Sequence, residues 1–342
     1  MIRILLADSS VTGRRLLLDL FSADPAIATV GEAGDGNSLV AMTKRLRPDV
    51  VVMDIDGPGM NGFDTTKRIM IEAPTPIVIV SSAPSERQVE LSILALRAGA
   101  LTVLPRPPEP VSAAEREQRQ RFAATVKAMA EVKVVRHWGT RDTAPRARAT
   151  AEVRPQRHSR VVAIAASTGG PAALQTLLGQ LPTEFPAPIL VVQHIAGGFI
   201  AGFTTWLNTV CSLRVKVAEA EETLEPRTVY VAPDNRHLGL LPNWTVLLSA
   251  APPLGGFRPS ATFLFQSVAQ AAGRAVTAII LTGMGRDGVD GLSFVRERGG
   301  FVIAQDEATS VVFGMPAAAI AANQVDAILP LPAIAPQLLD MV

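Results

Sequence analysis

The segment 161–174, VVAIAASTGGPAAL, places a hydroxyl pair, Ser167 and Thr168, directly after an apolar run. Two glycines and a proline follow, and a segment of helical composition begins there. An alcohol is a weak nucleophile until a neighbouring base takes its proton, so a catalytic serine needs an imidazole close by. Taken alone, a serine in front of a helix is more often an N-cap residue. Ser167 is therefore either a helix cap or a nucleophile at the end of a buried strand.

The chain has four histidines that could serve as that base. His137 and His158 lie in a polar, arginine-rich segment, and His237 opens a hairpin-like segment where a structural role is expected. His194 ends the run PILVVQH, in the same way that Ser167 follows VVAIAA. Because the carboxyl ends of parallel strands meet at one edge of a sheet, we expect His194 to lie beside Ser167.

A third apolar run, AVTAIILTG, leads into the turn GMGRDG, which carries Asp287. An imidazole that gains a proton is best held by a carboxylate, so three strand ends would bring a serine, a histidine and an aspartate to one crevice. The order Ser…His…Asp and the absence of G-x-S-x-G differ from α/β-hydrolases. An alternative is that Ser-Thr-Gly-Gly binds phosphate at a helix N-terminus, although a G-x-G-x-x-G fingerprint and a P-loop lysine are lacking.

Acidic residues follow apolar runs in the first third of the chain as well. Asp8 follows IRILLA, Asp54 lies in VVVMDIDGPGMNGFD, and Ser81 ends PIVIVS. Carboxylates brought together at one sheet edge repel one another, and a hard cation such as Mg²⁺ relieves that repulsion. An aspartate that faces such a metal can accept a phosphoryl group. The alternative is that these acids only cap helices and turns.

Strand-like and helix-like segments alternate along most of the sequence, which predicts an α/β fold with parallel sheets covered on both faces. The predicted strands are 2–7, 29–33, 49–55, 76–82 and 102–106 in the first part, and 161–166, 188–193, 228–233, 275–283, 300–305 and 325–330 in the second, with a β-hairpin over 237–249. We expect one domain over 1–110, a long helix (112–136) and a basic linker within 111–159, and a second domain over 160–342.

The composition narrows the class of protein. The 342 residues suffice for two domains, and 32 Lys and Arg nearly balance 31 Asp and Glu, so we expect no nucleic-acid partner. A single cysteine, Cys211, excludes an intrachain disulfide and suits a reducing compartment. The apolar N-terminal run is too short for a signal peptide, and no apolar stretch approaches the ~20 residues that span a bilayer. These features predict a cytoplasmic protein without membrane insertion.

Five motifs, ASTGGP, VVQHI, RPSATFLF, ILTGMGRDG and DEATSVVFGMP, resemble the chemotaxis methylesterase (CheB) family over nearly the whole chain. The resemblance implies a Rossmann-like catalytic domain that hydrolyses γ-glutamyl methyl esters on methyl-accepting chemoreceptor helices without a cofactor. Many members also deamidate receptor glutamines. It further implies the following roles: Ser167 as nucleophile, His194 as general base, Asp287 as the residue that orients His194, Thr168 and Met284 at the nucleophile and oxyanion site, and Arg258 as a substrate-site candidate.

Residues 1–110 resemble the flavodoxin-like receiver domain of response regulators. The resemblance implies phosphorylation of Asp54 by a chemotaxis-type histidine kinase, with Ser81 and residue 106 as the switch, and Mg²⁺ held by Asp8, Asp54 and the Asp56 carbonyl.

Three positions depart from these families: Ser9 replaces an acid, Arg106 replaces a lysine, and Thr262 replaces an acid after Arg258. Hard cations depend on the number of carboxylates, so we expect weak Mg²⁺ binding. The alternative to an enzyme is a non-catalytic scaffold or phosphorelay adaptor with the same fold.

Overall fold

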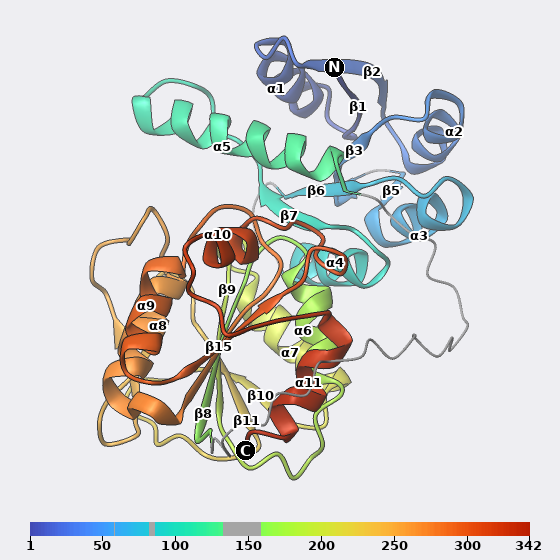
Figure 1. Cartoon of the computed structure of the whole chain (residues 1–342). Coiled ribbons are helices and arrows are strands. Elements are labelled where there is room, and N and C mark those ends of the chain that lie inside the picture. The colour runs from blue at the N-terminus through green and yellow to red at the C-terminus, as the bar shows by residue number, and fades with distance from the viewer. Residues whose placement is uncertain (58, 82–85, 133–158) are drawn as a thin grey trace.

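The computed structural model describes residues 1–57, 59–81, 86–132 and 159–342, and most of the predicted linker lies outside these ranges. Two parallel sheets with helices on both faces form the described part of the chain (Figure 1). The predicted α/β class is therefore confirmed, with five strands in the first sheet and seven in the second.

The N-terminal sheet has the strand order β2-β1-β3-β6-β7, and every neighbouring pair is parallel. Its strands are β1 (Ile2–Ala7), β2 (Ile27–Ala33), β3 (Val50–Asp54), β6 (Ile77–Ser81) and β7 (Thr102–Pro105). All five predicted strands are present. A short antiparallel pair, β4 (Asp56–Gly57) and β5 (Met60–Asn61), follows β3.

Alternate residues of these strands face opposite layers of helices. Ile4 and Leu6 of β1 pack toward α1 and α5, whereas Leu5 and Ala7 pack toward the other layer. The helices are α1 (Val11–Ser22), α2 (Gly36–Leu46), α3 (Gly62–Glu72), α4 (Glu86–Arg97) and α5 (Ala113–Ala130). Ser112 and Glu115 cap α5 reciprocally, which fixes where it begins. The helix ends at Ala130 rather than at 136, and 133–136 lie outside the described residues.

The C-terminal sheet has the order β10-β11-β9-β8-β14-β15-β16 and is also parallel. Its strands are β8 (Val161–Ala166), β9 (Ile189–Gln193), β10 (Arg214–Val217), β11 (Thr228–Val231), β14 (Val276–Ile280), β15 (Phe301–Gln305) and β16 (Ala327–Leu329). The predicted hairpin is present as β12 (His237–Leu240) and β13 (Val246–Ser249). Strand β10 was not predicted, because its sequence RVKV is short and half polar.

Two helical layers cover the C-terminal sheet. The first packs on residues such as Val162 and Ile164, and the second packs on their neighbours Val161 and Ala163. The first layer comprises α6 (Gly170–Leu178), α7 (Ile200–Val210) and α11 (Leu331–Leu339), and the second comprises α8 (Ala261–Ala272), α9 (Val289–Glu297) and α10 (Met315–Ala321). From β8 the chain adds strands on one side of the sheet, and from β14 onward it adds strands on the other side of β8. Such a reversal opens a crevice at the carboxyl ends of the strands.

The two halves of the molecule meet near that crevice. Helix α4 packs against α6 and α7 (Figure 1), and Val89 lies over Gly202, where a Cβ would collide with it. Phe199 is buried in a core cluster of the N-terminal half, although it belongs to the C-terminal half. The Gly169 N–H donates to the Leu101 carbonyl at 3.4 Å. The N-terminal half therefore contacts the chain that follows both β8 and β9.

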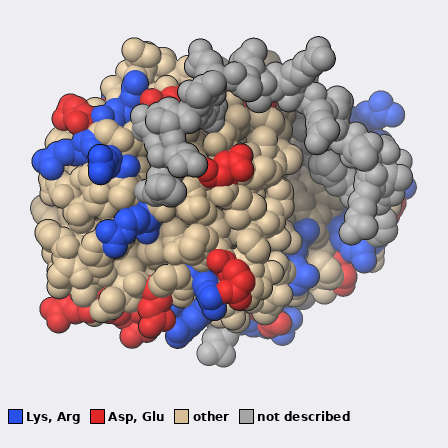
Figure 2. Space-filling view, turned by 60° about the horizontal axis from the view of Figure 1, so that its bottom comes forward, with Lys and Arg blue, Asp and Glu red and all other residues tan. Residues whose placement is uncertain are grey.

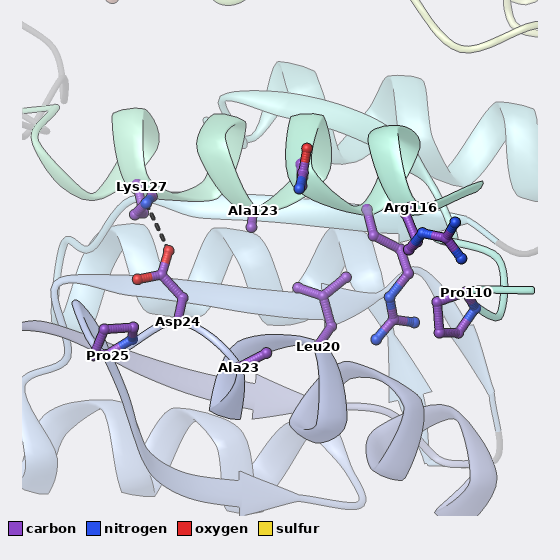
Figure 3. Close-up of a pocket in the computed structure, with 10 residues that line it drawn as sticks. Leu20, Ala23, Asp24, Pro25, Pro110, Arg116, Ala123 and Lys127 are labelled. Atoms are coloured by element: carbon purple, nitrogen blue, oxygen red, sulfur yellow. Dashed lines mark hydrogen bonds and ion pairs between the residues drawn. The ribbon is translucent and has the colours of Figure 1, made fainter. Parts of the chain in front are cut away.

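Charged residues of both signs are interspersed on the face of the molecule shown in Figure 2. A cavity of about 410 Å³ opens between α1 and α5, where Lys127 pairs with Asp24 at 2.6 Å (Figure 3). None of the residues that the sequence predicts to be functional lines this cavity. Within the described residues, no helix combines the length and apolar character needed to cross a bilayer.

Candidate active site

Ser167 immediately follows β8 and precedes the turn into α6. Gly169 is the N-cap residue of α6, with φ 76°, and no side chain caps this helix. The interpretation of Ser167 as a helix cap is therefore wrong. Its backbone is fixed instead, because its N–H donates to the Thr282 carbonyl at 3.1 Å and its carbonyl accepts from the Gly170 N–H at 2.8 Å. The hydroxyl thus stands at the crevice without a capping role.

His194 occupies the equivalent position after β9. Ala166 and Gln193 are paired in the sheet, and the His194 N–H donates to the Ala166 carbonyl at 2.9 Å. Neighbouring strands lie about 4.8 Å apart, so Ser167 and His194 stand side by side at the sheet edge. The Gln193 side chain links them, since its Nε2 donates to the carbonyls of Ser167 and His194, each at 2.8 Å. A Cβ at Gly170 would overlap Gln193 Oε1, so only glycine fits beside this amide.

Asp287 reaches His194 from the turn after β14, with Oδ2 3.0 Å from His194 Nε2. Its carboxylate also accepts from Ser260 Oγ at 2.8 Å, from the Ala261 N–H at 2.7 Å and from the Thr262 N–H at 3.1 Å. The last two groups belong to the N-terminus of α8, which favours an anion. Burial alone would raise the pKa of Asp287, but the hydrogen bond and charge of His194 and the bonds from α8 lower it to about 2. Asp287 is therefore ionised at any ordinary pH.

The two nitrogens of the His194 ring have different surroundings. Nε2 faces Asp287, and the ring stacks on Phe257 with centroids 4.3 Å apart and planes at 14°. Nδ1 is buried and has no hydrogen-bond partner within the described residues. An ionised carboxylate next to Nε2 holds the proton there, which leaves the lone pair on Nδ1. Nδ1 is therefore the atom of His194 that can accept a proton.

Backbone N–H groups near Ser167 could stabilise an oxyanion. Gly283 lies so close to Ser167 that a Cβ there would be 2.7 Å from the serine Cβ. Thr282 Oγ1 donates to the Thr168 carbonyl at 2.9 Å and fixes the two turns together. The N–H groups of Thr168 and Met284 form no hydrogen bond within the described residues. Both are thus available to a negatively charged oxygen.

The Arg258 guanidinium forms hydrogen bonds within the C-terminal half of the chain. Its Nε donates to Asn235 Oδ1 at 2.8 Å, and its Nη1 donates to the carbonyls of Ala250 and Ala251, each at 3.1 Å. The bond to Asn235 joins the loop that carries Phe257 to the loop before β12, and the bonds to Ala250 and Ala251 lie within the loop after β13. The geometry supports a loop-bracing role for Arg258, and the substrate contact that the family resemblance implies stays a prediction.

Thr262 and His237 contribute to the support of the site. The Thr262 hydroxyl accepts from the Gly288 N–H at 2.9 Å, which ties α8 to the turn that carries Asp287. His237 accepts a hydrogen bond from the Ser260 N–H at 3.2 Å and stacks on Phe263. This fully buried position agrees with the structural role expected of His237.

The acidic residues of the N-terminal half gather at the carboxyl edge of its sheet. Asp8 and Asp54 are both buried, and Arg106 Nη2 lies 2.7 Å from Asp8 Oδ2 and 3.3 Å from Asp54 Oδ2. Ser81 ends β6 nearby, and its hydroxyl contacts Gln88 at 3.1 Å. Asp56 lies in β4, and its side chain is outside the described part of the structure. Among the described residues, no cluster of three or more His, Cys, Asp or Glu is suited to a metal.

Gln193, Phe257 and Ser260 also build the site, although the sequence did not single them out. Gln193 offered a signal, because a polar residue at the end of the buried run PILVVQ requires a partner. Ser260 stands in the motif RPSATFLF, but its contact with Asp287 joins residues 27 positions apart. Phe257 lies in a glycine-rich loop whose course no local pattern specifies.

The comparisons with known proteins identify the family of each half of the chain. The CheB methylesterase family matches residues 162–338, and the response regulator receiver domain matches residues 4–115. Protein-glutamate methylesterase/protein-glutamine glutaminase 4 of Myxococcus xanthus is 51% identical over 98% of this chain and 96% of that protein. The corresponding protein of the group 3 operon of Rhizobium meliloti is 43% identical over 98% of this chain and 95% of its own.

A solved structure resembles the C-terminal half. The catalytic domain of Thermotoga maritima CheB methylesterase is 40% identical, covers 54% of this chain and 99% of its own, and aligns with a TM-score of 0.52. The family match covers the residues that form the crevice, from Ser167 to Asp287. The chain therefore belongs to the CheB methylesterase family and joins its methylesterase domain to an N-terminal receiver domain.

Proposed function

We propose that this protein hydrolyses γ-glutamyl methyl esters on the cytoplasmic helices of methyl-accepting chemoreceptors, and that Ser167, His194 and Asp287 are its catalytic residues. The observation that carries the proposal is the His194–Asp287 pair beside Ser167, with Nδ1 of the imidazole open. The relatives named protein-glutamate methylesterase/protein-glutamine glutaminase support the same substrate class.

In the first half of the reaction, the Ser167 oxygen attacks the ester carbonyl while His194 Nδ1 takes the hydroxyl proton. Asp287 stabilises the imidazolium through Nε2, and the N–H groups of Thr168 and Met284 face the developing oxyanion. The carbon–oxygen bond to the methoxy group then breaks. The imidazolium returns its proton to that oxygen, methanol leaves, and a glutamyl ester of Ser167 remains.

In the second half, water attacks this ester and gives its proton to the same nitrogen. The bond to Ser167 breaks, the serine regains a proton, and a free glutamate side chain is released. A primary amide presents the same acyl carbon with ammonia as the leaving group. Deamidation of receptor glutamines, which the names of the relatives include, therefore needs no further residue.

The receiver domain contacts segments next to the catalytic residues, and these contacts provide a means of controlling access to the active site. It contacts Gly169, two residues beyond the nucleophile, and Phe199, five residues beyond the base. Arg121 of α5 lies close to Gly256, where a Cβ would be 3.1 Å from its guanidinium, and the next residue stacks on His194. We infer that the receiver restricts the approach of a receptor helix to the crevice, and that a chemotaxis-type kinase is its upstream partner.

Two assays test the catalytic assignment. The purified protein should release methanol from methylated receptor and should be labelled by a fluorophosphonate at Ser167. Ser167→Ala should abolish the labelling and lower methanol release by at least about 10³-fold, since the covalent route is lost. Ser293→Ala is the matched control, because Ser293 is a half-buried residue of α9 whose hydroxyl donates only to the Asp290 carbonyl, and it should leave both unchanged. A Ser167→Ala variant that keeps most of its activity would exclude the serine mechanism, and a labelled protein without methanol release would favour a different substrate.

A further inference from the structure

The acidic site of the receiver contains an internal cation. Asp8 follows β1, Asp54 is the last residue of the adjacent strand β3, and each is more than nine-tenths buried. Arg106, from the segment after β7, extends its guanidinium between them, and Nη2 approaches Oδ2 of both carboxylates at 2.7 and 3.3 Å. A single guanidinium therefore bridges the two acids that would otherwise repel each other.

Each carboxylate of this site has one oxygen in a backbone hydrogen bond and one that faces Arg106, and Asp8 Oδ2 meets Arg106 as an ion pair without a hydrogen bond among the described residues. Asp8 Oδ1 accepts from the Ser10 N–H at 2.7 Å, and Asp54 Oδ1 accepts from the Ile55 N–H at 2.8 Å. The remaining oxygen of each carboxylate faces Arg106. A divalent cation would need those same oxygens at about 2.0–2.1 Å and would stand against a positive charge.

The space for the guanidinium depends on a glycine. Gly13 lies in the first turns of α1 and is buried, and a Cβ at this position would overlap both Asp8 Oδ2 and Arg106 Nη1. Arginine occupies more volume than lysine and carries its charge on a planar group, so its fit beside Asp8 depends on the space that Gly13 leaves. Ser9, Gly13 and Arg106 are thus compatible with one another. Ser9 removes one carboxylate from the site, Gly13 leaves room for a cation larger than lysine, and Arg106 is that cation.

These residues do not fit a Mg²⁺ site of the usual receiver type. We propose that Arg106 is the resident counter-ion of Asp8 and Asp54 and takes the place of the divalent metal in this receiver. The conformation of the receiver, and its contact with the methylesterase domain, are then independent of Mg²⁺. Ser9→Asp combined with Arg106→Lys should convert the site into one that binds the metal.

The test measures metal binding directly and needs no catalytic activity. Full-length protein is titrated into Mn²⁺, and the free ion is followed by electron paramagnetic resonance. The unaltered protein should bind at least about tenfold more weakly than the Ser9→Asp/Arg106→Lys variant, because a carboxylate is added and the bridging cation is removed. In parallel, MgCl2 should raise the melting temperature of the double variant and leave that of the unaltered protein unchanged.

Arg106→Gln provides a second variant in which only the cation is removed. It should lower the melting temperature, because Asp8 and Asp54 then face each other uncompensated, and MgCl2 should restore part of the loss. Arg15→Gln, an exposed position on the same helix as Gly13, removes the same charge elsewhere and should show neither effect. Mn²⁺ binding by the unaltered protein that equals the double variant and disappears in Asp54→Asn would overturn the proposal. Failure of both Arg106 variants to respond to metal would overturn it as well.

Discussion

Replacing Asp287 by asparagine tests the geometry of the active site most directly. All four groups around the carboxylate are donors in the present arrangement: the His194 ring, the Ser260 hydroxyl and two backbone N–H groups of α8. An asparagine amide has one acceptor oxygen and one donor nitrogen, so in either orientation its NH2 group faces two of these donors. If the NH2 group faces His194, the imidazole must move its proton to Nδ1, and the lone pair of Nδ1 that would accept the serine proton is lost.

The magnitude follows from the same contacts. The pKa of Asp287 falls from 3.8 to about 2, which corresponds to about 2 kcal/mol of folding free energy at neutral pH. The unsatisfied amide adds the cost of a buried polar group, so we expect the free energy of unfolding to fall by about 2–4 kcal/mol. In another serine triad the same substitution lowers kcat by about 10⁴. We expect kcat to fall by ~10²–10⁴-fold here, because asparagine would likewise hold the imidazole in the wrong tautomer.

The assay pairs methanol release from methylated receptor with urea unfolding of the same protein. Ser260→Ala is the matched control, since it removes one bond to Asp287 Oδ1 and leaves the contact of Oδ2 with His194. It should cost about 1 kcal/mol of stability and change kcat by less than about tenfold. If Asp287→Asn retains kcat within about tenfold of the unaltered enzyme, Asp287 does not control the tautomer of His194 and the mechanism given above is wrong.

Further predictions concern pH, the receiver and the absence of a catalytic metal. Activity should show no step near pH 4, because Asp287 with its pKa of about 2 is already ionised there. Since that pKa is depressed, the stability that Asp287 provides is present above about pH 4 and is lost as pH falls toward 2, so the difference in urea unfolding between the unaltered protein and Asp287→Asn should narrow in that window. Deletion of residues 1–136 should raise methanol release, as should Ile93→Arg, which disrupts the packing of α4 on the methylesterase domain. EDTA should leave the activity of the deletion variant unchanged, and inhibition that Zn²⁺ or Mg²⁺ reverses would contradict a metal-free triad.

The apolar runs of the sequence determined both sheets and the positions of the candidate residues. Strands such as 161–166 and 188–193 are uninterrupted apolar segments followed by polar residues, and this pattern leaves few alternatives to buried parallel strands. Ser167 and His194 each follow such a run directly, so their placement at one sheet edge depends only on local features and on parallel pairing. Strand β10 lacked that signal, because an edge strand that is half polar resembles a loop.

Contacts between distant segments were decided only by the tertiary structure. The nitrogen of His194 that faces Asp287 depends on how the turn after β14 meets α8, and the use of Arg258 as a loop brace depends on Asn235, 23 residues away. Ser9 and Arg106 could be read from the sequence as departures from the family, but their relation through Gly13 could not. Local propensity and hydrophobic periodicity act over a few residues, whereas side-chain direction and charge pairing are fixed by packing between elements that are far apart in the chain.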